Sequence, residues 1–240
     1  MVGDRRLRII SRLVGDGGPE TKRLCDVCRE VTDMTGAGIM LMAGDVPHGS
    51  VCTTNAVSEL IEQLQYALGE GPCVDAYSQD RPVLEPDLAL PAEPRWLAFR
   101  SPALEAGVRA VFGFPLQVGA VRLGALNLYR DRPGPLTADQ HADALVMADV
   151  VAQAVLVLQA GAPPGRLAAE LEAGADFHSV VHQAAGMVAA QLGVSVGQAL
   201  VRLRAYAFGN ERPLRLVAEG VVDRTLRFDP RSDDEKGAGP

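Results

Sequence analysis

The 240-residue sequence lacks a long uninterrupted apolar run. Near the start, three arginines are followed by only two isoleucines before Ser11, which is too short for the apolar region of a secretory signal peptide. The most apolar long segment, 140–159, is interrupted by one histidine and two aspartates. We therefore expect a cytoplasmic protein with no membrane span and no membrane partner. The length allows one large domain or two small ones.

Cysteine is also scarce, and four residues of this kind in a chain without a secretion signal do not indicate a disulfide framework. Cys25 and Cys28 form a C-x-x-C pair, but they lie inside a predicted helix and no second pair accompanies them. No histidine pair stands at ligand spacing near Cys52 or Cys73. We expect small buried side chains here, in preference to a zinc or redox site.

The sequence has no overall excess of positive charge, since its net charge is −7, and this excludes general polyanion binding by the whole surface. The charge is unevenly distributed. Residues 1–165 hold 14 basic and 20 acidic side chains, whereas residues 166–228 hold seven basic, all arginine, and six acidic. Five of those arginines fall between Arg202 and Arg224. The asymmetry indicates different partners for the two halves.

Signatures of nucleophilic or phosphate-binding enzymes are missing, including G-x-S-x-G and the P-loop pattern. His178 and His182 are four residues apart but have no carboxylate between them, so we expect one or both to lie on the exposed face of their helix and to contact a partner. The Gly-Glu-Gly-Pro-Cys segment 69–73 predicts a tight turn before a short helix. Asp87 and Trp96 are equally compatible with a pocket lining and with a capping or core role. We expect no enzyme, and we assign no catalytic residue and no metal ligand.

Gly-Ala-Pro-Pro-Gly at 161–165 breaks an apolar helical pattern and predicts a linker between two domains, 1–160 and 166–228. The polar tail, 229–240, is predicted to be disordered. In the first domain, periodicity predicts helices at 20–35, 57–68 and 138–159, and strands at 37–43, 48–54, 110–118 and 121–129. This order predicts an α+β fold, an antiparallel sheet flanked by helices.

The second domain is predicted to be a small three-helix bundle. The first helix starts at Asp176 and ends at Gly193, the second follows a capping box at Ser195, and the third runs from Pro213 to about Leu226. On the second helix, the predicted buried stripe consists of Val196, Ala199, Leu200, Leu203 and Ala207.

An arginine and an aromatic ring flank this stripe on each side. Arg202 and Tyr206 lie on one side, and Arg204 and Phe208 on the other. RNA loops are recognised by stacking on aromatic and arginine planes together with phosphate contacts. The alternative, which composition alone favours, is a solvated helix face with ordinary ion pairs, because the net charge of the bundle is small.

A pattern of residues is spread over the three predicted helices of the second domain: His182-Gln183-Ala184-Ala185-Gly186-Met187, Val194-Ser195, Ala199, Leu203-Arg204, Ala207, Leu214 and Val217-Ala218. With this pattern, residues 166–228 resemble the ANTAR family of RNA-binding domains. Many ANTAR domains have lysine where this chain has Ala185. If that lysine contacts phosphate, other basic residues must supply the contact here.

The first domain has a second set of characteristic segments, at 24–28, 35–41, 68–73, 86–88 and 124–129. In the order and spacing of these segments, residues 20–160 resemble a GAF domain of the kind fused to ANTAR domains. The resemblance implies a sensory domain that binds a small molecule or a partner. It names no ligand, so the cofactor is unknown.

Together the two halves resemble GAF–ANTAR transcription antitermination regulators, which hold paired RNA stem-loops so that an overlapping terminator cannot form. Two stem-loops suit a homodimer, and helix 138–159 is the predicted interface. The alternative is that one face of this helix packs on the sheet and the rest covers the opening helix. For RNA binding we expect Tyr206 to stack and four arginines to contact phosphate or base edges: Arg202, Arg204, Arg212 and Arg215.

Two other functional classes stay open. A GAF fold can host a thiol enzyme, for example one acting on free methionine sulfoxide, or a redox or metal sensor, and Cys52 and Cys73 are the candidates for both. Thiol chemistry needs an exposed thiolate of low pKa and a resolving partner, for which the sequence gives no evidence. The bundle could also bind a protein helix instead of RNA.

Overall fold

The computed structural model describes residues 2–13, 21–43, 46–91, 93–160 and 169–228. The chain divides into two compact units, Met1–Ala175 and Asp176–Pro240, which are described separately below. The predicted linker at 161–165 and the predicted tail at 229–240 lie outside the described residues.

The first unit is built on a five-stranded antiparallel sheet with the strand order β2-β1-β5-β4-β3. The strands are β1 Gly36–Ala43, β2 Val46–Thr53, β3 Val83–Glu85, β4 Ala110–Val118 and β5 Val121–Arg130. The fold class is the predicted one, although the short β3 was not predicted. Gly119 has the positive φ (59°) that the two-residue turn of the β4–β5 hairpin favours.

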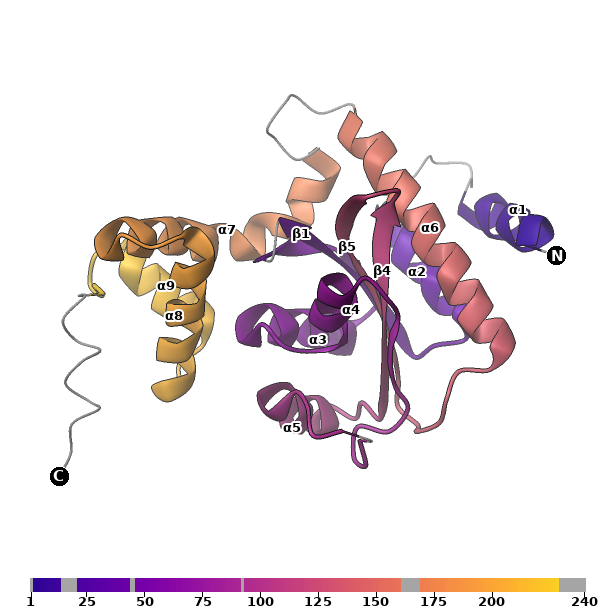
Figure 1. The fold of residues 1–240 in the computed structure, drawn as a ribbon, viewed down its shortest axis with the longest axis horizontal. Coiled ribbons are helices and arrows are strands. Elements are labelled where there is room, and N and C mark those ends of the chain that lie inside the picture. Colours follow the sequence, from indigo (N-terminus) through magenta and orange to yellow (C-terminus); the bar gives the residue numbers. More distant parts are fainter. Residues whose placement is uncertain (1, 14–20, 44–45, 92, 161–168, 229–240) are drawn as a thin grey trace. The chain divides into compact units, whose positions relative to one another are not determined.

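Helices cover both faces of the sheet (Figure 1). One face packs against α2 Thr21–Thr32 and α6 Ala138–Ala160. The other packs against α3 Ala56–Leu68 and α4 Pro72–Gln79, and α5 Leu97–Glu105 packs on α3 and adds Phe99 and Ala103 to the same core. The alternation of side chains along β5 supplies both cores, because Leu126 and Leu128 join the α2–α6 core and Tyr129 joins the core beneath α3 and α5.

Helix α6 is a core helix of the first unit. Its buried side consists of Asp143, Ala144, Met147, Ala148, Val150, Val151, Ala152 and Val155. By length and composition α6 could cross a membrane, but this side packs against the sheet, as in the core helix of a globular domain. Helices α1 and α2 also contact α6, while Leu145 and Val157 stay exposed. The structure therefore agrees with the alternative in which α6 covers both the sheet and the opening helix.

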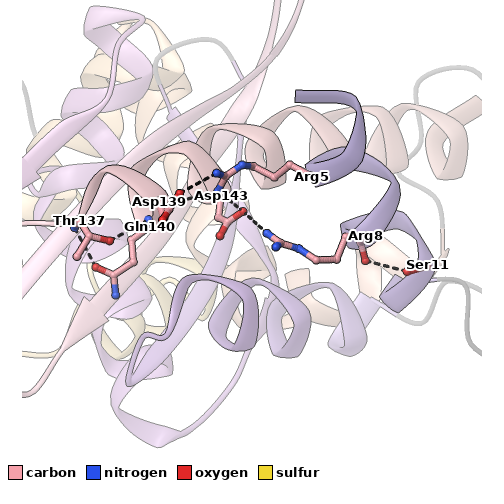
Figure 2. Close-up of polar contacts among 7 residues, drawn as sticks. All are labelled: Arg5, Arg8, Ser11, Thr137, Asp139, Gln140 and Asp143. Atoms are coloured by element: carbon pink, nitrogen blue, oxygen red, sulfur yellow. Dashed lines mark hydrogen bonds and ion pairs between the residues drawn. The ribbon is translucent and has the colours of Figure 1, made fainter. Parts of the chain in front are cut away.

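Helix α1 (Val2–Leu13) was not predicted from the sequence. Charged side chains join it to the first turns of α6 (Figure 2). Arg5 donates to Asp143 Oδ1 at 2.7 Å and to Asp139 Oδ1 at 2.9 Å. Arg8 donates to the same oxygen of Asp143 at 2.8 Å. One nearly buried carboxylate thus receives two guanidinium groups and fixes α1 along α6.

The described part of the second unit consists of three helices, as predicted: α7 Ala169–Leu192, α8 Val196–Gly209 and α9 Leu214–Val222. Gly193 ends α7 with a positive φ of 66°, and the Ser195 hydroxyl accepts from the Gln198 backbone N–H, so both predicted caps are confirmed. Two predicted boundaries were wrong. Helix α7 begins at Ala169 instead of Asp176, because the alanine, glutamate and leucine residues before Asp176 have high helix propensity.

The other wrong boundary is the end of α9, which stops at Val222 and not near Leu226. Arg224 has a positive φ of 62°, and the Leu226 N–H donates to the Gly220 carbonyl at 2.8 Å. This turn reverses the chain. Arg224 therefore follows the third helix and does not lie on it, contrary to the predicted range.

The core of the bundle uses one side of each helix. Its buried residues are Val181, Ala184, Ala185, Val188, Ala199, Leu200, Leu203, Ala207, Leu214, Val217, Ala218 and Val221. The predicted stripe on α8 is confirmed at four positions and wrong at Val196, which is 48% exposed in the first turn. Ala185 lies inside this core, so the position at which many ANTAR domains have lysine is a packing position here.

Candidate functional site

The predicted RNA-binding arginines of α8 lie on opposite sides of its buried stripe. Arg202 and Arg204 flank the fully buried Leu203, and both are partly exposed. Side chains two positions apart on an α-helix point in directions that differ by about 200°. The structure therefore places each guanidinium on a separate edge of the helix and does not join the two into one patch.

Tyr206 is partly buried and already has an aromatic neighbour. Its ring meets Phe228 at a centroid distance of 5.4 Å and an interplanar angle of 63°. The Phe228 N–H donates to Gln191 Oε1 at 2.9 Å, which holds the segment after α9 against α7. Stacking on an RNA base would use the part of the Tyr206 ring that Phe228 leaves uncovered.

Arg212 and Arg215 lie at and after the turn between α8 and α9, and both are exposed. The Arg212 N–H donates to the Ala207 carbonyl at 2.9 Å, so the backbone of this turn is fixed to the end of α8. Arg215 pairs with Glu219 at 3.3 Å, one turn further along α9. An exposed pair of this kind contributes only about 0–1 kcal/mol, so a phosphate could replace Glu219 at little cost.

Four large apolar side chains on α8 and α9 are exposed, and among them the sequence placed only Phe208 on an exposed flank of α8. They are Val196, Val201, Phe208 and Leu216. The ring of Phe208 is 69% exposed and lies one turn from Arg204. An exposed aromatic ring beside a guanidinium is a stacking platform for a base, so Phe208 is a further candidate contact.

The first unit contains a buried polar cluster that was not predicted from the sequence. Glu62 and Gln65 of α3 and Asn127 of β5 are each no more than 2% exposed. Asn127 Nδ2 donates to Glu62 Oε1 at 3.3 Å. Three atoms have no hydrogen-bond partner among the described residues: Glu62 Oε2, Gln65 Nε2 and Asn127 Oδ1. The sequence signal for this cluster was a pair of polar residues three positions apart, Glu62 and Gln65, on a predicted helix face next to Ile61.

Burial raises the pKa of Glu62 from 4.5 to about 8, against the smaller lowering effect of the Asn127 hydrogen bond. The carboxyl group therefore holds a proton at neutral pH. Because Gly38 has no side chain, it leaves space for this carboxyl group. A side chain at Gly38 would place its Cβ 2.5 Å from Glu62 Oε1. The cluster combines an acid, a carboxamide donor and a carboxamide acceptor, which is a hydrogen-bonding set suited to a small polar ligand.

The segment from Gly69 to Cys73 is the tight turn that the sequence predicts. Gly69 caps α3 with a φ of 68°. Glu70 Oε1 accepts from the backbone N–H groups of Ala98 (2.6 Å) and Phe99 (2.8 Å) at the start of α5. The Cys73 N–H donates to the Gln65 side chain at 2.7 Å. This segment fastens α3, α4 and α5 together.

Asp87 and Trp96 have the capping and core roles that the sequence left open. Asp87 Oδ1 accepts from the Ala89 N–H at 3.0 Å and pairs with Arg109 at 3.1 Å. Trp96 is 5% exposed, and its Nε1 donates to Asp75 Oδ2 at 2.9 Å. Both side chains are occupied in holding the loops beside α5.

The expectation that all four cysteines are free was wrong, because Cys25 of α2 and Cys52 of β2 form a disulfide. Cys28 and Cys73 are free and buried. Burial raises the pKa of both thiols, and for Cys73 the charge of Glu62 raises it further. Cys52 packs with the α2–α6 core, whereas Cys73 contacts Gln65 on the other face. The structure therefore does not bring Cys52 and Cys73 together as a catalytic pair.

Within the described ranges, no three His, Cys, Asp or Glu side chains are grouped so that they could hold a metal ion. His182 is partly exposed on α7. The side chain of His178 lies outside the described residues, so the predicted contact between this pair and a partner is not tested.

Comparisons with known proteins agree with the two units. Residues 21–156 match the model of the GAF domain, and residues 169–222 match the model of the ANTAR domain. No curated protein matches the chain significantly. The GAF match begins after α1, so that helix lies outside the part of the chain that the family shares.

Solved structures show the same fold in the first unit. One is the GAF domain of a phosphoenolpyruvate-protein phosphotransferase from Coxiella burnetii, with 14% identity, a TM-score of 0.51, and coverage of 66% of this chain and 95% of that one. The corresponding domain from Acinetobacter has 11% identity, a TM-score of 0.52, and coverage of 67% and 96%. At this identity the likeness shows the fold alone.

The two matched domains define a regulatory protein in which a sensory domain precedes an RNA-binding domain. The chain belongs to the GAF domain family and has the GAF–ANTAR architecture. GAF and ANTAR domains are regulatory modules and not catalytic ones.

Proposed function

We propose that this protein is an RNA-binding transcription antitermination regulator. The observation that carries the proposal is the order of a GAF domain and an ANTAR domain in one chain. The ANTAR domain holds paired stem-loops of a nascent transcript, so that the overlapping terminator does not form. The GAF domain controls this binding, and the protein has no catalytic activity of its own.

The proposed RNA contacts are Arg202, Arg204, Tyr206, Arg212 and Arg215. All five are at least partly exposed, as a nucleic-acid contact requires. The exposed guanidinium groups at the turn between α8 and α9 would bind phosphate, and the rings at the edges of α8 would stack on loop bases. The weak surface pair of Arg215 with Glu219 supports exchange for a phosphate partner.

The proposed functional form is a homodimer in the cytoplasm, with one stem-loop for each bundle. Leu145 and Val157 are exposed apolar side chains on α6, which leaves part of that helix available to a second copy. The proposed domain limits are 1–160 and 166–228, with the linker 161–165 between them. Two bundles on one assembly raise the effective concentration of the second stem-loop once the first is bound.

The proposed place of ligand recognition is the buried cluster of Glu62, Gln65 and Asn127. Its support is the presence of three buried polar atoms without a partner among the described residues. A small polar ligand that satisfies these atoms would favour one arrangement of α3 on the sheet. It could change RNA binding only by binding one arrangement of the protein better than the other.

Selection from a randomised RNA pool tests the RNA-binding proposal and identifies the preferred loops at the same time. The full-length protein is incubated with a pool of two-stem-loop RNAs whose loops are randomised, and bound RNA is amplified over several rounds. We expect enrichment of defined loop sequences in both loops, with binding that weakens as salt rises. Equal recovery of all loops, or preference for a single stem-loop, would contradict the proposal.

The control is an RNA with the same stems and the selected loops in scrambled order. Phosphate contacts alone would bind both RNAs equally, whereas base contacts in the loops distinguish them. A matched protein control is Arg81→Ala, which removes an exposed arginine from the GAF domain. This variant should bind the selected RNA as the wild type does.

A further inference from the structure

The disulfide joins an inner helix to the edge of the sheet. Cys25 lies on α2 in the core with no exposed surface, and Cys52 lies on β2, the first strand in the sheet order. The two residues are 27 positions apart in the sequence. The cross-link therefore fixes the edge strand to a helix that also packs against α1 and α6.

The two cysteine residues of the disulfide differ in their exposure to solvent. Cys52 is partly exposed, whereas Cys25 is enclosed by the α2–α6 core. In thiol–disulfide exchange a thiolate attacks one sulfur and expels the other, so access decides which sulfur reacts. An external thiol reaches Cys52 first and expels the sulfur of Cys25.

The remaining thiols do not compete for this bond. Cys28 is one turn from Cys25 on α2, but it is fully buried, and burial raises its pKa well above the ordinary value. Cys73 is fully buried on the other face of the sheet. Neither provides the thiolate that exchange requires, so the disulfide has two discrete states, closed and open.

We propose that Cys25 and Cys52 form a redox-active site whose reaction partners are cellular thiols and their disulfides. The proposal rests on the proposed function in one respect: a protein that acts on nascent transcripts works where thiols are kept reduced. Disulfides that do form in such a compartment are usually transient and serve redox sensing or catalysis.

The reaction conserves atoms and electrons. A thiolate RS⁻ attacks Cys52 Sγ, the Cys25–Cys52 bond breaks, and Cys25 leaves as a thiolate that takes a proton. A second RSH then attacks the mixed disulfide as its thiolate, forms RSSR and releases Cys52, which takes the second proton. Two electrons pass from two thiols to the protein disulfide. Oxidation by RSSR is the reverse sequence.

Opening the bond frees β2 from α2 without removing any side chain. The chain between the two cysteines then regains conformational freedom in the unfolded state, so the open form is less stable. We expect the Tm of the GAF domain to fall by roughly 5–10 °C on reduction. Amide exchange should increase in β2 and in the adjoining part of α2 more than in β4.

The test counts free thiols in the folded full-length protein after equilibration in glutathione buffers, from strongly oxidising to strongly reducing. The samples are then quenched in acid, unfolded, alkylated in denaturant and weighed by mass spectrometry, so that the buried thiols are counted too. We expect a reversible transition between two free thiols and four, within the range from oxidising to cytosol-like buffers. Two thiols throughout the range would show a permanent cross-link, and four throughout would show no disulfide. Either result would overturn the proposal.

Two variants test whether the thiol transition belongs to the bond between Cys25 and Cys52. Cys52→Ala should show three thiols in every buffer, and Cys28→Ala should keep the transition, between one thiol and three. A transition that survives in Cys52→Ala, or that vanishes in Cys28→Ala with the fold intact by circular dichroism, would contradict the pairing. None of these measurements uses RNA, so their failure is distinct from failure of the proposed function.

Discussion

The Glu62 carboxyl group lies against the Asn127 carboxamide between α3 and β5, with Asn127 Nδ2 donating to Oε1 at 3.3 Å. Glu62 Oε2 and Asn127 Oδ1 have no partner among the described residues. A proton on Glu62 gives the carboxyl group a hydrogen-bond donor that a carboxylate lacks. The arrangement is therefore consistent with the raised pKa of Glu62, which burial causes.

This pair predicts a pH-dependent stability. Because the pKa of Glu62 is about 8 in the folded protein and about 4.5 when unperturbed, the folded state retains the proton over that interval. The contribution of Glu62 to stability is complete below pH 4.5, and it is lost as the pH rises to and through 8. We expect the Tm of the GAF domain to fall between pH 6 and pH 9 in the wild type.

Glu62→Gln removes the titrating proton and should flatten this part of the pH profile. Thermal unfolding followed by circular dichroism between pH 5 and pH 9 measures the difference. Glu59→Gln, on the exposed side of the same helix, is the matched control and should keep the wild-type profile. Parallel profiles for the wild type and Glu62→Gln would show that Glu62 is not the titrating group.

The hydrogen bonds of the Glu70 side chain should contribute to the stability of the turn that follows α3. Its Oε1 accepts two backbone N–H groups at the start of α5, so Glu70→Ala leaves both without that acceptor. We expect a loss of about 1–2 kcal/mol in the free energy of unfolding, as for other helix caps. Glu70→Gln keeps an acceptor oxygen and should lose less. Equal losses in the free energy of unfolding for the two variants, measured in urea, would show that the charge of Glu70, and not its hydrogen bonds, stabilises the turn.

The ion pairs shown in Figure 2 should hold α1 against α6. Asp143 accepts from both Arg5 and Arg8 and is nearly buried, whereas Asp139 accepts from Arg5 alone and is exposed. Asp143→Asn should therefore increase amide exchange in α1 by much more than Asp139→Asn does. Added salt should increase exchange in the wild type, because it screens these charges. Equal exchange in both variants would mean that other contacts, such as the Arg6–Asp149 ion pair and apolar packing, hold α1.

Replacing a single exposed arginine of the second unit should weaken RNA binding without abolishing it. Arg204→Ala and Arg212→Ala should each weaken binding of a selected RNA and lower its salt dependence by about one ion, provided each neutralises one phosphate. Neither side chain is part of the buried core, so the helical content should be unchanged. Titrations at two salt concentrations measure both quantities. Wild-type affinity in either variant would remove that residue from the interface.

Local signals in the sequence were reliable where one segment determines the structure. The capping box at Ser195, the left-handed cap at Gly193 and the hairpin turn at Gly119 each depend on residues within a few positions of one another. The apolar runs of β4 and β5 were equally informative, because most residues of both strands are buried and helices cover both faces of the sheet.

Features that depend on distant segments could not be predicted in this way. The bond between Cys25 and Cys52 requires β2 to lie at the sheet edge beside α2, which no local pattern specifies. Likewise, Glu62 is buried only because Asn127 and Gly38 meet it across the sheet. The early end of α9 depends on the positive φ of Arg224, a conformation that its residue type does not suggest.

Single-round transcription through a leader that ends in an overlapping terminator tests the central claim most directly. The leader carries two stem-loops obtained by selection with the full-length protein, and the products are separated by length. We predict that the protein raises the fraction of full-length transcript, and that scrambling either loop abolishes this effect. Unchanged termination at protein concentrations that saturate the leader would contradict the account.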